Sequence, residues 1–106
     1  MRHLVLFTIL VAATTSSAAE TATGLVTGLG CHNTDPTCFV NLDGYSSSAY
    51  CNHTNQLRWD TSSDWGRRFY ATLLAAKLSG SPVWLEVSQS TCHAQGFPTF
   101  VYGGLY

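Results

Sequence analysis

The sequence is poor in charged residues and, beyond its N-terminus, in long hydrophobic runs. Asp, Glu, Lys and Arg make up 10% of the 106 residues, and the formal net charge is −1. Proteins that bind a phosphate backbone need a basic surface, so this balance argues against nucleic acid as a partner. No apolar stretch after the N-terminal one approaches the length that crosses a bilayer. We expect neither nucleic-acid binding nor a membrane span in the mature protein.

The sequence also lacks the motifs that mark common catalytic centres. It contains no Gly-x-Ser-x-Gly elbow, no His-Glu-x-x-His and no phosphate-binding loop. The carboxylates are scattered, and Asp60 and Asp64 bracket the start of a predicted helix, where the helix dipole favours negative charge. That position favours a capping role over an acid–base pair. We expect no enzyme and no cofactor.

The first 19 residues have the build of a secretory signal peptide. A short basic start is followed by an apolar run over Leu4–Ala13 and then by a tail of small residues. Ser17 and Ala19 suit the −3 and −1 positions of a cleavage site, which makes Glu20 the first mature residue. The alternative is an uncleaved membrane anchor. We predict a signal peptide over 1–19, one domain over 20–106, and a secreted or periplasmic protein.

Four cysteines follow this leader, at Cys31, Cys38, Cys51 and Cys92. An even number in a small exported chain indicates two disulfides, with three possible pairings, each bridge worth roughly 2–4 kcal/mol. The turn-rich segment between Cys31 and Cys38 reverses the chain, so we favour Cys31–Cys38 and Cys51–Cys92. The spacing fits no zinc module and disulfides consume the thiols, so we expect no metal site.

Histidines accompany three of these cysteines. The favoured Cys51–Cys92 bridge would bring His53 and His93 near one another on the surface, where two imidazoles could titrate together or hold a metal ion. The simpler interpretation is two independent, solvated loop histidines.

One amphipathic helix is predicted, over residues 64–79. Thr61 with Asp64 three residues later fits a capping signal, Gly80 suits a left-handed C-cap, and Pro82 prevents resumption of the helix. We expect burial of an apolar stripe and its flank, which comprise Trp65, Phe69, Tyr70, Leu73, Leu74, Ala76 and Leu78. The sequence shows no second helix, so strands must cover this stripe.

Five strands are predicted around the helix. They are a glycine-interrupted strand over Thr23–Cys31, then Cys38–Leu42, Gln56–Asp60, Pro82–Ser88 and Thr99–Tyr102. Gln89–Pro98 is predicted to be a polar loop. The order β-β-β-α-β-β favours a mainly β fold with one α-helix, a five-stranded Greek-key barrel of the OB-fold type. An open sheet with the helix across one face is the alternative.

A resemblance supports this fold. Cys51, then Trp59-Asp60-Thr61, the run Arg67 to Val83 and Thr91-Cys92 resemble small exported bacterial OB-fold proteins. The layout is also similar to B subunits of pentameric toxins of the subtilase-cytotoxin and pertussis-like kind. The resemblance implies the Cys51–Cys92 pairing, ring formation and glycan binding. The sugar-contacting residues of those toxins do not match position by position, so none is carried over.

The predicted fold suggests where a ligand would bind. OB-folds take oligosaccharides on the face of the second and third strands, flanked by two loops, which here are His32–Thr37 and Gln89–Pro98. The candidate contacts are the aromatic, polar and basic side chains of this region: Asn41, Arg58, His32, His93, Tyr45 and Tyr50. For Tyr45 and Tyr50 the alternative is a role in covering the lower edge of the barrel.

The tryptophans receive different interpretations. We expect Trp59 and Trp65 in the core, whereas Trp84 alternates with the buried residues of its strand and suits an exposed subunit contact. Together these observations predict an exported, non-enzymatic binding module that binds glycans and is a candidate homo-oligomer. The alternative is a periplasmic structural, inhibitor or immunity-type domain that binds another envelope protein.

Overall fold

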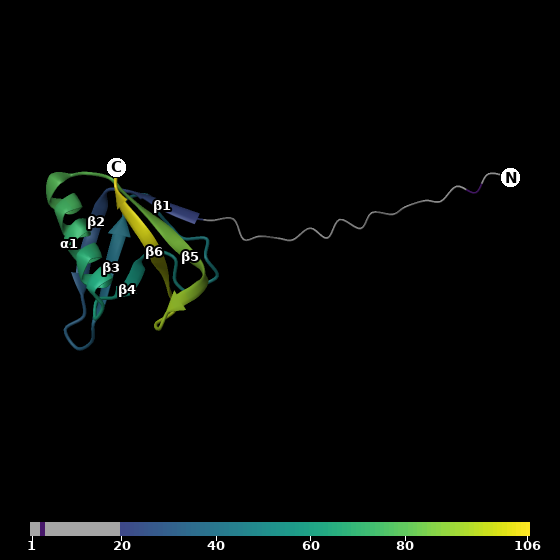
Figure 1. Ribbon diagram of the computed structural model, residues 1–106, viewed down its shortest axis with the longest axis horizontal. Coiled ribbons are helices and arrows are strands. Elements are labelled where there is room, and N and C mark those ends of the chain that lie inside the picture. The colour runs from purple at the N-terminus through teal and green to yellow at the C-terminus, as the bar shows by residue number, and fades with distance from the viewer. Residues whose placement is uncertain (1–2, 4–19) are drawn as a thin grey trace.

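The computed structural model describes His3 and residues 20–106, so the predicted signal peptide lies outside the described residues except for His3. It contains six strands and one helix (Figure 1). In chain order these are β1 Glu20–Gly24, β2 Val26–Cys31, β3 Thr37–Leu42, β4 Leu57–Asp60, α1 Asp64–Ser79, β5 Val83–His93 and β6 Phe97–Leu105. The predicted mainly β fold with one helix is confirmed.

The strands form two three-stranded antiparallel sheets, with orders β1-β5-β6 and β2-β3-β4. The prediction of a closed five-stranded barrel was therefore wrong. The strand expected over Thr23–Cys31 breaks at Gly24, which has φ +147°. A Cβ atom there would lie 2.9 Å from the Asp43 carbonyl oxygen, so the bend needs glycine. Because of this bend, β1 pairs with β5 while β2 pairs with β3.

The two sheets meet at β4 and β6 without forming one continuous sheet. Among the described residues, no hydrogen-bonded ladder joins these two strands. Side chains make the contact instead: the ring centroids of Trp59 on β4 and Phe100 on β6 lie 5.2 Å apart, and both side chains are 1% exposed. Phe69 of α1 packs edge-on against Phe100 at 5.1 Å. An aromatic cluster therefore closes the seam between the sheets.

The helix has the predicted extent but a different N-cap. Ser63 caps it, accepting a hydrogen bond from the Gly66 backbone N–H at 3.2 Å. Thr61, the predicted cap, lies earlier and donates its hydroxyl to the Pro36 carbonyl at 2.8 Å. The C-cap is as expected, since Gly80 has φ 66° and ψ 28°. Tertiary contact with the loop after β2 thus draws Thr61 away from the helix.

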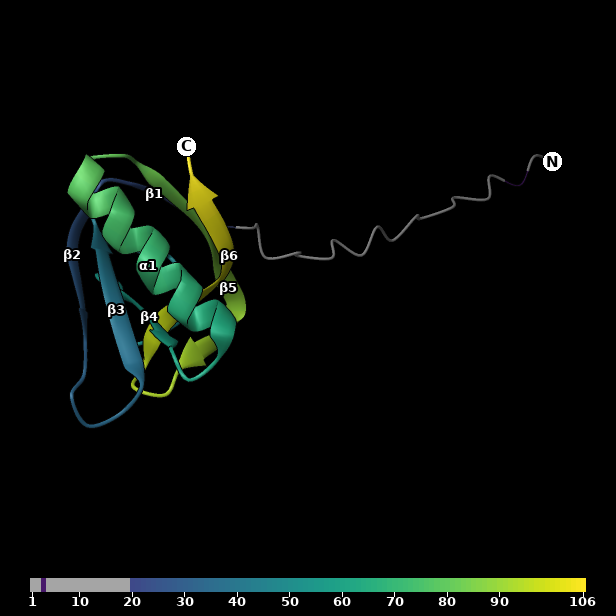
Figure 2. The same cartoon turned by 60° about the vertical axis from the view of Figure 1, so that its left-hand side comes forward.

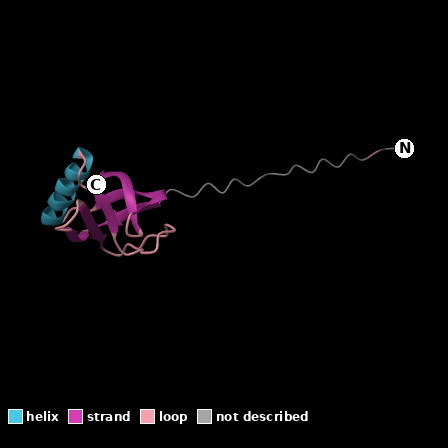
Figure 3. Ribbon diagram, turned by 90° about the horizontal axis from the view of Figure 1, so that it is seen from below, coloured by secondary structure: helices cyan, strands magenta, loops and turns pink. Residues whose placement is uncertain are grey.

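The helix buries less of its apolar surface than predicted. Leu73 and Ala76 are buried and Phe69 and Tyr70 are half-buried, but Trp65, Leu74 and Leu78 are 39, 39 and 80% exposed. The prediction of a fully buried stripe, and of Trp65 in the core, was wrong. The helix lies as a single layer against one side of the strands (Figures 2 and 3), so only one side of it meets the core. The prediction of Trp59 in the core is confirmed.

The prediction of a polar loop over Gln89–Pro98 was also wrong for most of these residues. Strand β5 continues to His93 and β6 begins at Phe97, and the two are paired through Cys92 with Pro98 and His93 with Phe97. The residues of this hairpin are too polar to show a buried face, so their strand pairing leaves no hydrophobic alternation in the sequence. The extension matters because it carries Gln95 and Phe97 toward β4.

Two disulfides connect these elements, and they are the pairings favoured from the sequence. Cys31–Cys38 joins facing positions on β2 and β3, and Cys51–Cys92 ties the loop before β4 to β5. No helix in the described part of the chain is long and apolar enough to span a membrane.

Candidate functional site

The outer face of sheet β2-β3-β4 carries Asn41 and Arg58, two of the candidate contacts predicted from the sequence. On β3, Val40 and Leu42 point into the core, so Phe39 and Asn41 point outward. On β4, Arg58 alternates with buried Leu57 and Trp59 and is also on the outside. The cross-strand register sets Phe39 opposite Arg58. We call the surface formed by Phe39, Asn41, Gln56, Arg58, Gln95 and Phe97 the Arg58 face.

Glycines on β2 leave one side of the Arg58 face without projecting side chains. Gly28 is opposite Asn41, and Gly30 is opposite Phe39. A Cβ atom on Gly30 would lie 2.6 Å from Cζ of Phe39. The tip of the Phe39 ring therefore covers the Gly30 backbone, and a larger residue on β2 would displace the ring.

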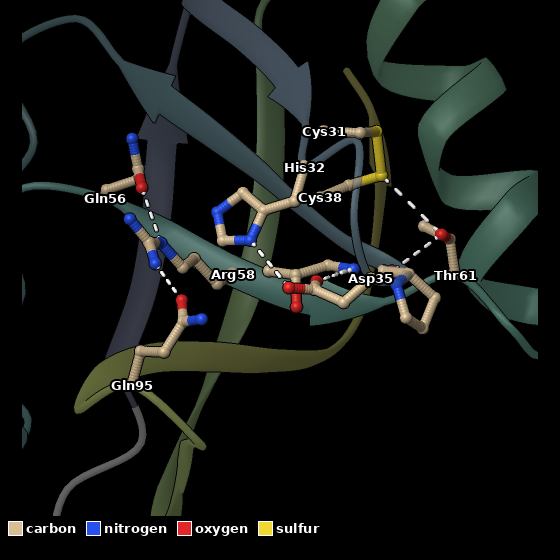
Figure 4. A network of polar contacts seen from close by, with 10 residues as sticks. Cys31, His32, Asp35, Cys38, Gln56, Arg58, Thr61 and Gln95 are labelled. Carbon is tan, nitrogen blue, oxygen red and sulfur yellow. Dashed lines mark hydrogen bonds and ion pairs between the residues drawn. A yellow bond between two sulfur atoms is a disulfide. The ribbon is translucent and has the colours of Figure 1, made fainter.

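A chain of hydrogen bonds links the polar side chains of the Arg58 face. Asn41 donates to the Asn55 carbonyl at 2.8 Å and accepts from Gln56 Nε2 at 3.2 Å. Gln56 in turn accepts from Arg58 Nε at 2.7 Å, and Arg58 Nη1 donates to Gln95 Oε1 (Figure 4). Side chains held in this way lose little further conformational entropy when a ligand binds.

A stack of rings lies beside Arg58 in this series of hydrogen bonds. The guanidinium carbon of Arg58 lies 3.5 Å from the ring centroid of Phe97. The His53 ring stacks on the same Phe97 ring, with centroids 4.2 Å apart and planes 18° apart. Both groups are too close to the ring to share one side of it, so Phe97 lies between them. A cation–π contact of this kind contributes about 0.5–1 kcal/mol when exposed.

The loop after β2, with His32 and Asp35, borders the Arg58 face at the Cys31–Cys38 end of β2 and β3 (Figure 4). Nδ1 of His32 lies 3.1 Å from Oδ2 of Asp35, and Oδ1 of Asp35 accepts the Thr37 backbone N–H at 2.9 Å. Hydrogen bonds from the Thr37 side chain and backbone, and then from His32, lower the pKa of Asp35 to about 2. Asp35 is therefore a carboxylate at neutral pH, and it fixes the shape of this loop.

His93 ends strand β5 and is partly buried. Its Nδ1 is buried without a hydrogen-bond partner among the described residues. Burial lowers the pKa of His93, and the nearby positive charge of Arg58 lowers it further, against the opposing effect of Asp60 and Asp35. The ring is therefore neutral at pH 7. His53 stacks on Phe97, the residue that faces His93 across the β5–β6 hairpin, so the His53–His93 pair stays a prediction.

The two tyrosines named from the sequence do not join the hydrogen-bonded chain of the Arg58 face. Tyr45 packs against the core, and its hydroxyl donates to Glu20 Oε1 at 2.6 Å. Burial raises the pKa of Tyr45 well above its usual range, and the bond to Glu20 adds to this. Tyr50 is 66% exposed, with its hydroxyl bonded to the Ser90 carbonyl at 2.5 Å. Tyr45 thus braces β1, while Tyr50 presents its ring to solvent.

No metal centre is evident in the described residues, where no three His, Cys, Asp or Glu side chains converge. A separate cleft of about 260 Å³ lies between α1 and β6. Its walls are mostly apolar, and the lining residues are Trp65, Arg68, Phe69, Thr72, Gly103 and Gly104. None of these six belongs to the Arg58 face.

Comparisons with protein-family models, curated proteins and solved structures find no match to this chain. The residues themselves must therefore carry any statement about function. To the candidate ligand contacts named from the sequence, the geometry adds Phe39, Gln56, His53, Gln95 and Phe97. Strand alternation was enough to identify Phe39 and Gln56. The other three lie in segments whose position beside β4 only the folded chain reveals.

Proposed function

We propose that this protein is a non-enzymatic, glycan-binding module and that the Arg58 face is its binding surface. The observation that carries the proposal is the linked row of Asn41, Gln56, Arg58 and Gln95 beside the half-buried rings of Phe39 and Phe97. Sugars present hydroxyl groups around a ring whose C–H faces are apolar. A surface that offers amide and guanidinium groups next to aromatic rings matches both features.

Several properties favour a neutral glycan in an extracytoplasmic compartment. The leader-like N-terminus and the two disulfides support a secreted or periplasmic protein. The carboxylates of Asp35 and Asp60 stand near the histidine end of the face and disfavour an acidic ligand there. The low content of Lys and Arg supports the exclusion of nucleic acid.

We also propose that β1 and β2 correspond to one strand of an OB-fold, bent at Gly24, with the β4–β6 seam left unpaired. On this interpretation the Arg58 face corresponds to the ligand face of OB-folds. The likeness to pentameric-toxin B subunits is part of the same proposal and implies oligomer formation.

A glycan array probed with the oxidised exported protein tests the function. We expect binding to neutral glycans, and we expect Arg58→Met to weaken it about 10- to 100-fold, since a hydrogen bond from a charged group is worth about 1.5–3 kcal/mol. Lys77→Met is the matched control, because it removes the charge of an exposed lysine on α1, outside the Arg58 face. Thermal unfolding of both variants establishes that they are folded.

Other results would contradict the proposal. A protein that binds no glycan, or one whose binding is the same in Arg58→Met, has another function. Binding that survives Arg58→Met but is lost in Tyr50→Ala would move the site to the exposed loop of Tyr50.

A protein-interaction role is the second candidate, supported by exposed apolar side chains on α1 and β6. Trp65 is 39% exposed, Val101 is 56% and Leu105 is 47%. Light scattering of the purified protein tests its simplest form, self-association. An oligomer that Val101→Lys converts to monomer would support it, whereas a monomer at all concentrations would exclude this form.

A further inference from the structure

The opposite sheet carries a second surface of different chemistry, on its outer face. On β5, Val83, Leu85 and Val87 are buried, so Trp84 and Glu86 point outward. The register places Thr23, Trp84 and Gly104 in one row across β1, β5 and β6, and Thr21, Glu86 and Tyr102 in the next. We call the surface formed by Thr21, Thr23, Trp84, Glu86, Tyr102 and Gly104 the Trp84 face.

Two aromatic rings stand at the centre of this face. The Trp84 and Tyr102 ring centroids are 5.8 Å apart, with planes at 77°. Tyr102 is 54% exposed. A Cβ atom on Gly104 would lie 3.5–3.7 Å from three atoms of the Trp84 indole, so the indole lies over the bare backbone of Gly104. Two rings at nearly a right angle form two walls against which an apolar or cationic group can pack.

Glu86 adds a fixed negative charge beside these rings. Its Oε2 accepts the Thr21 hydroxyl at 2.8 Å, and its Oε1 has no partner among the described residues. Strands β1, β5 and β6 contain no Lys or Arg, so no basic side chain of this sheet neutralises Glu86. The face therefore combines aromatic walls with an unneutralised carboxylate, which is the composition that attracts an organic cation.

The neighbouring threonine hydroxyls indicate which kind of cation this face would bind. Thr21 and Thr23 are exposed on the same two rows and can exchange hydrogen bonds with a polyhydroxylated ligand. A bare alkylammonium group would leave them unused. We propose that the Trp84 face binds a protonated amino sugar, with the pyranose ring against Trp84 and Tyr102 and the ammonium group at Glu86.

This site is separate from the Arg58 face and does not depend on it. Its residues come from the other sheet, and its charge has the opposite sign. If both faces bind sugars, the domain is bivalent, and a ligand that spans both gains avidity without any new contact.

The test compares two oligosaccharides that differ only at nitrogen: a glucosamine trimer with free amines and its fully N-acetylated counterpart. We expect the free amine to bind the oxidised protein at least about tenfold more tightly, because only it forms a charge-assisted hydrogen bond with Glu86. NMR titration should shift the Trp84 indole N–H, which the spectrum of Trp84→Phe assigns.

Glu86→Gln keeps an oxygen to accept from Thr21 but removes the charge. We expect it to abolish the preference for the free amine, while Tyr102→Ala weakens binding of both trimers. Lys77→Met, an exposed residue of α1 outside both faces, serves as the control and should leave both affinities unchanged. Because Tyr102 is exposed, its substitution tests the site even if Glu86→Gln alters folding.

Three outcomes would overturn the proposal. They are equal affinity for the two trimers, an affinity unchanged in Glu86→Gln, and shifts that leave the Trp84 indole unaffected. Tetramethylammonium that binds as tightly as the glucosamine trimer would also overturn it, since the ammonium group alone would then be the ligand. Failure of the neutral-glycan array leaves these measurements unaffected, so the two proposals fail separately.

Discussion

The two sheets share one construction rule and yet present different chemistry to solvent. In each, alternate residues of the central strand fill the core and the others face outward. On the Arg58 face the outward side chains bond to one another and surround a cation. On the Trp84 face they leave two rings and a carboxylate oxygen accessible. Alternation thus decides which residues are exposed, whereas cross-strand register decides which of them meet.

The seam between the sheets is where the largest change is expected. Phe100 on β6 is 1% exposed and contacts Trp59, Trp65 and Phe69. Since no backbone ladder joins β4 to β6, we expect Phe100→Ala to lower the free energy of unfolding by about 3–5 kcal/mol. Urea denaturation followed by circular dichroism measures this. A loss below about 1 kcal/mol would mean that the sheets hold together by other means.

The disulfides offer the next comparison, because Cys31–Cys38 lies within one sheet, whereas Cys51–Cys92 ties the loop before β4 of that sheet to β5 of the other. Cys51–Cys92 closes a loop of sequence separation 41, and Cys31–Cys38 one of 7. Chain entropy then predicts stabilisation of about 3.9 kcal/mol for the first and about 2.4 kcal/mol for the second. Double alanine replacement of each pair, followed by guanidinium denaturation, measures both. A larger loss from the shorter bridge would contradict the entropic account.

A matched pair of glycines compares the two outer faces directly. At Gly30, under Phe39, a Cβ atom would lie 2.6 Å from the ring, whereas at Gly104, under Trp84, the closest contact would be 3.5 Å. We expect Gly30→Ala to displace Phe39 and to cost about 1–3 kcal/mol, and Gly104→Ala to change stability by less than about 1 kcal/mol. Thermal unfolding of both variants measures these two changes in stability. Equal losses would show that Phe39 moves aside freely.

The smallest effect concerns acid stability at the border of the Arg58 face. The pKa of Asp35 is lowered to about 2 by Thr37 and His32, so the unfolded chain takes up a proton more readily than the folded one. The stabilisation is present above the ordinary pKa of about 3.8 and is lost as the pH falls toward 2. We expect Asp35→Asn to flatten the melting-temperature profile between pH 4 and 2. An unchanged profile would assign acid sensitivity to other carboxylates.

Much of the local structure could be predicted from the sequence. The helix boundaries follow from Asp64 and Gly80, and the buried residues of β5 follow from the alternation of Val83, Leu85 and Val87. The pairing Cys31–Cys38 follows from the short turn between the cysteines. The N-cap was misplaced by two residues because Thr61 bonds to Pro36, a contact that no local pattern reveals.

Some residues of the Arg58 face could be predicted from the sequence, and others could not. Asn41 and Arg58 could be placed on one face from alternation alone, because each follows a buried neighbour. Gln95 and Phe97 could not, since their approach to Arg58 depends on the hairpin that joins β5 to β6. Polar side chains in that hairpin give no hydrophobic signal, so its strands resembled a loop.

The amino-acid sequence by itself determined the helix over 64–79, the Cys31–Cys38 disulfide and the outward-facing residues of β3, β4 and β5, because these depend on neighbours along the chain or on a short turn. The tertiary structure alone decided that the first strand bends at Gly24 to serve both sheets, and that Arg58 meets Phe97 while Glu86 stands beside Tyr102. Those contacts join residues that are distant in the chain. Their register is fixed by packing across strands, which no local pattern records.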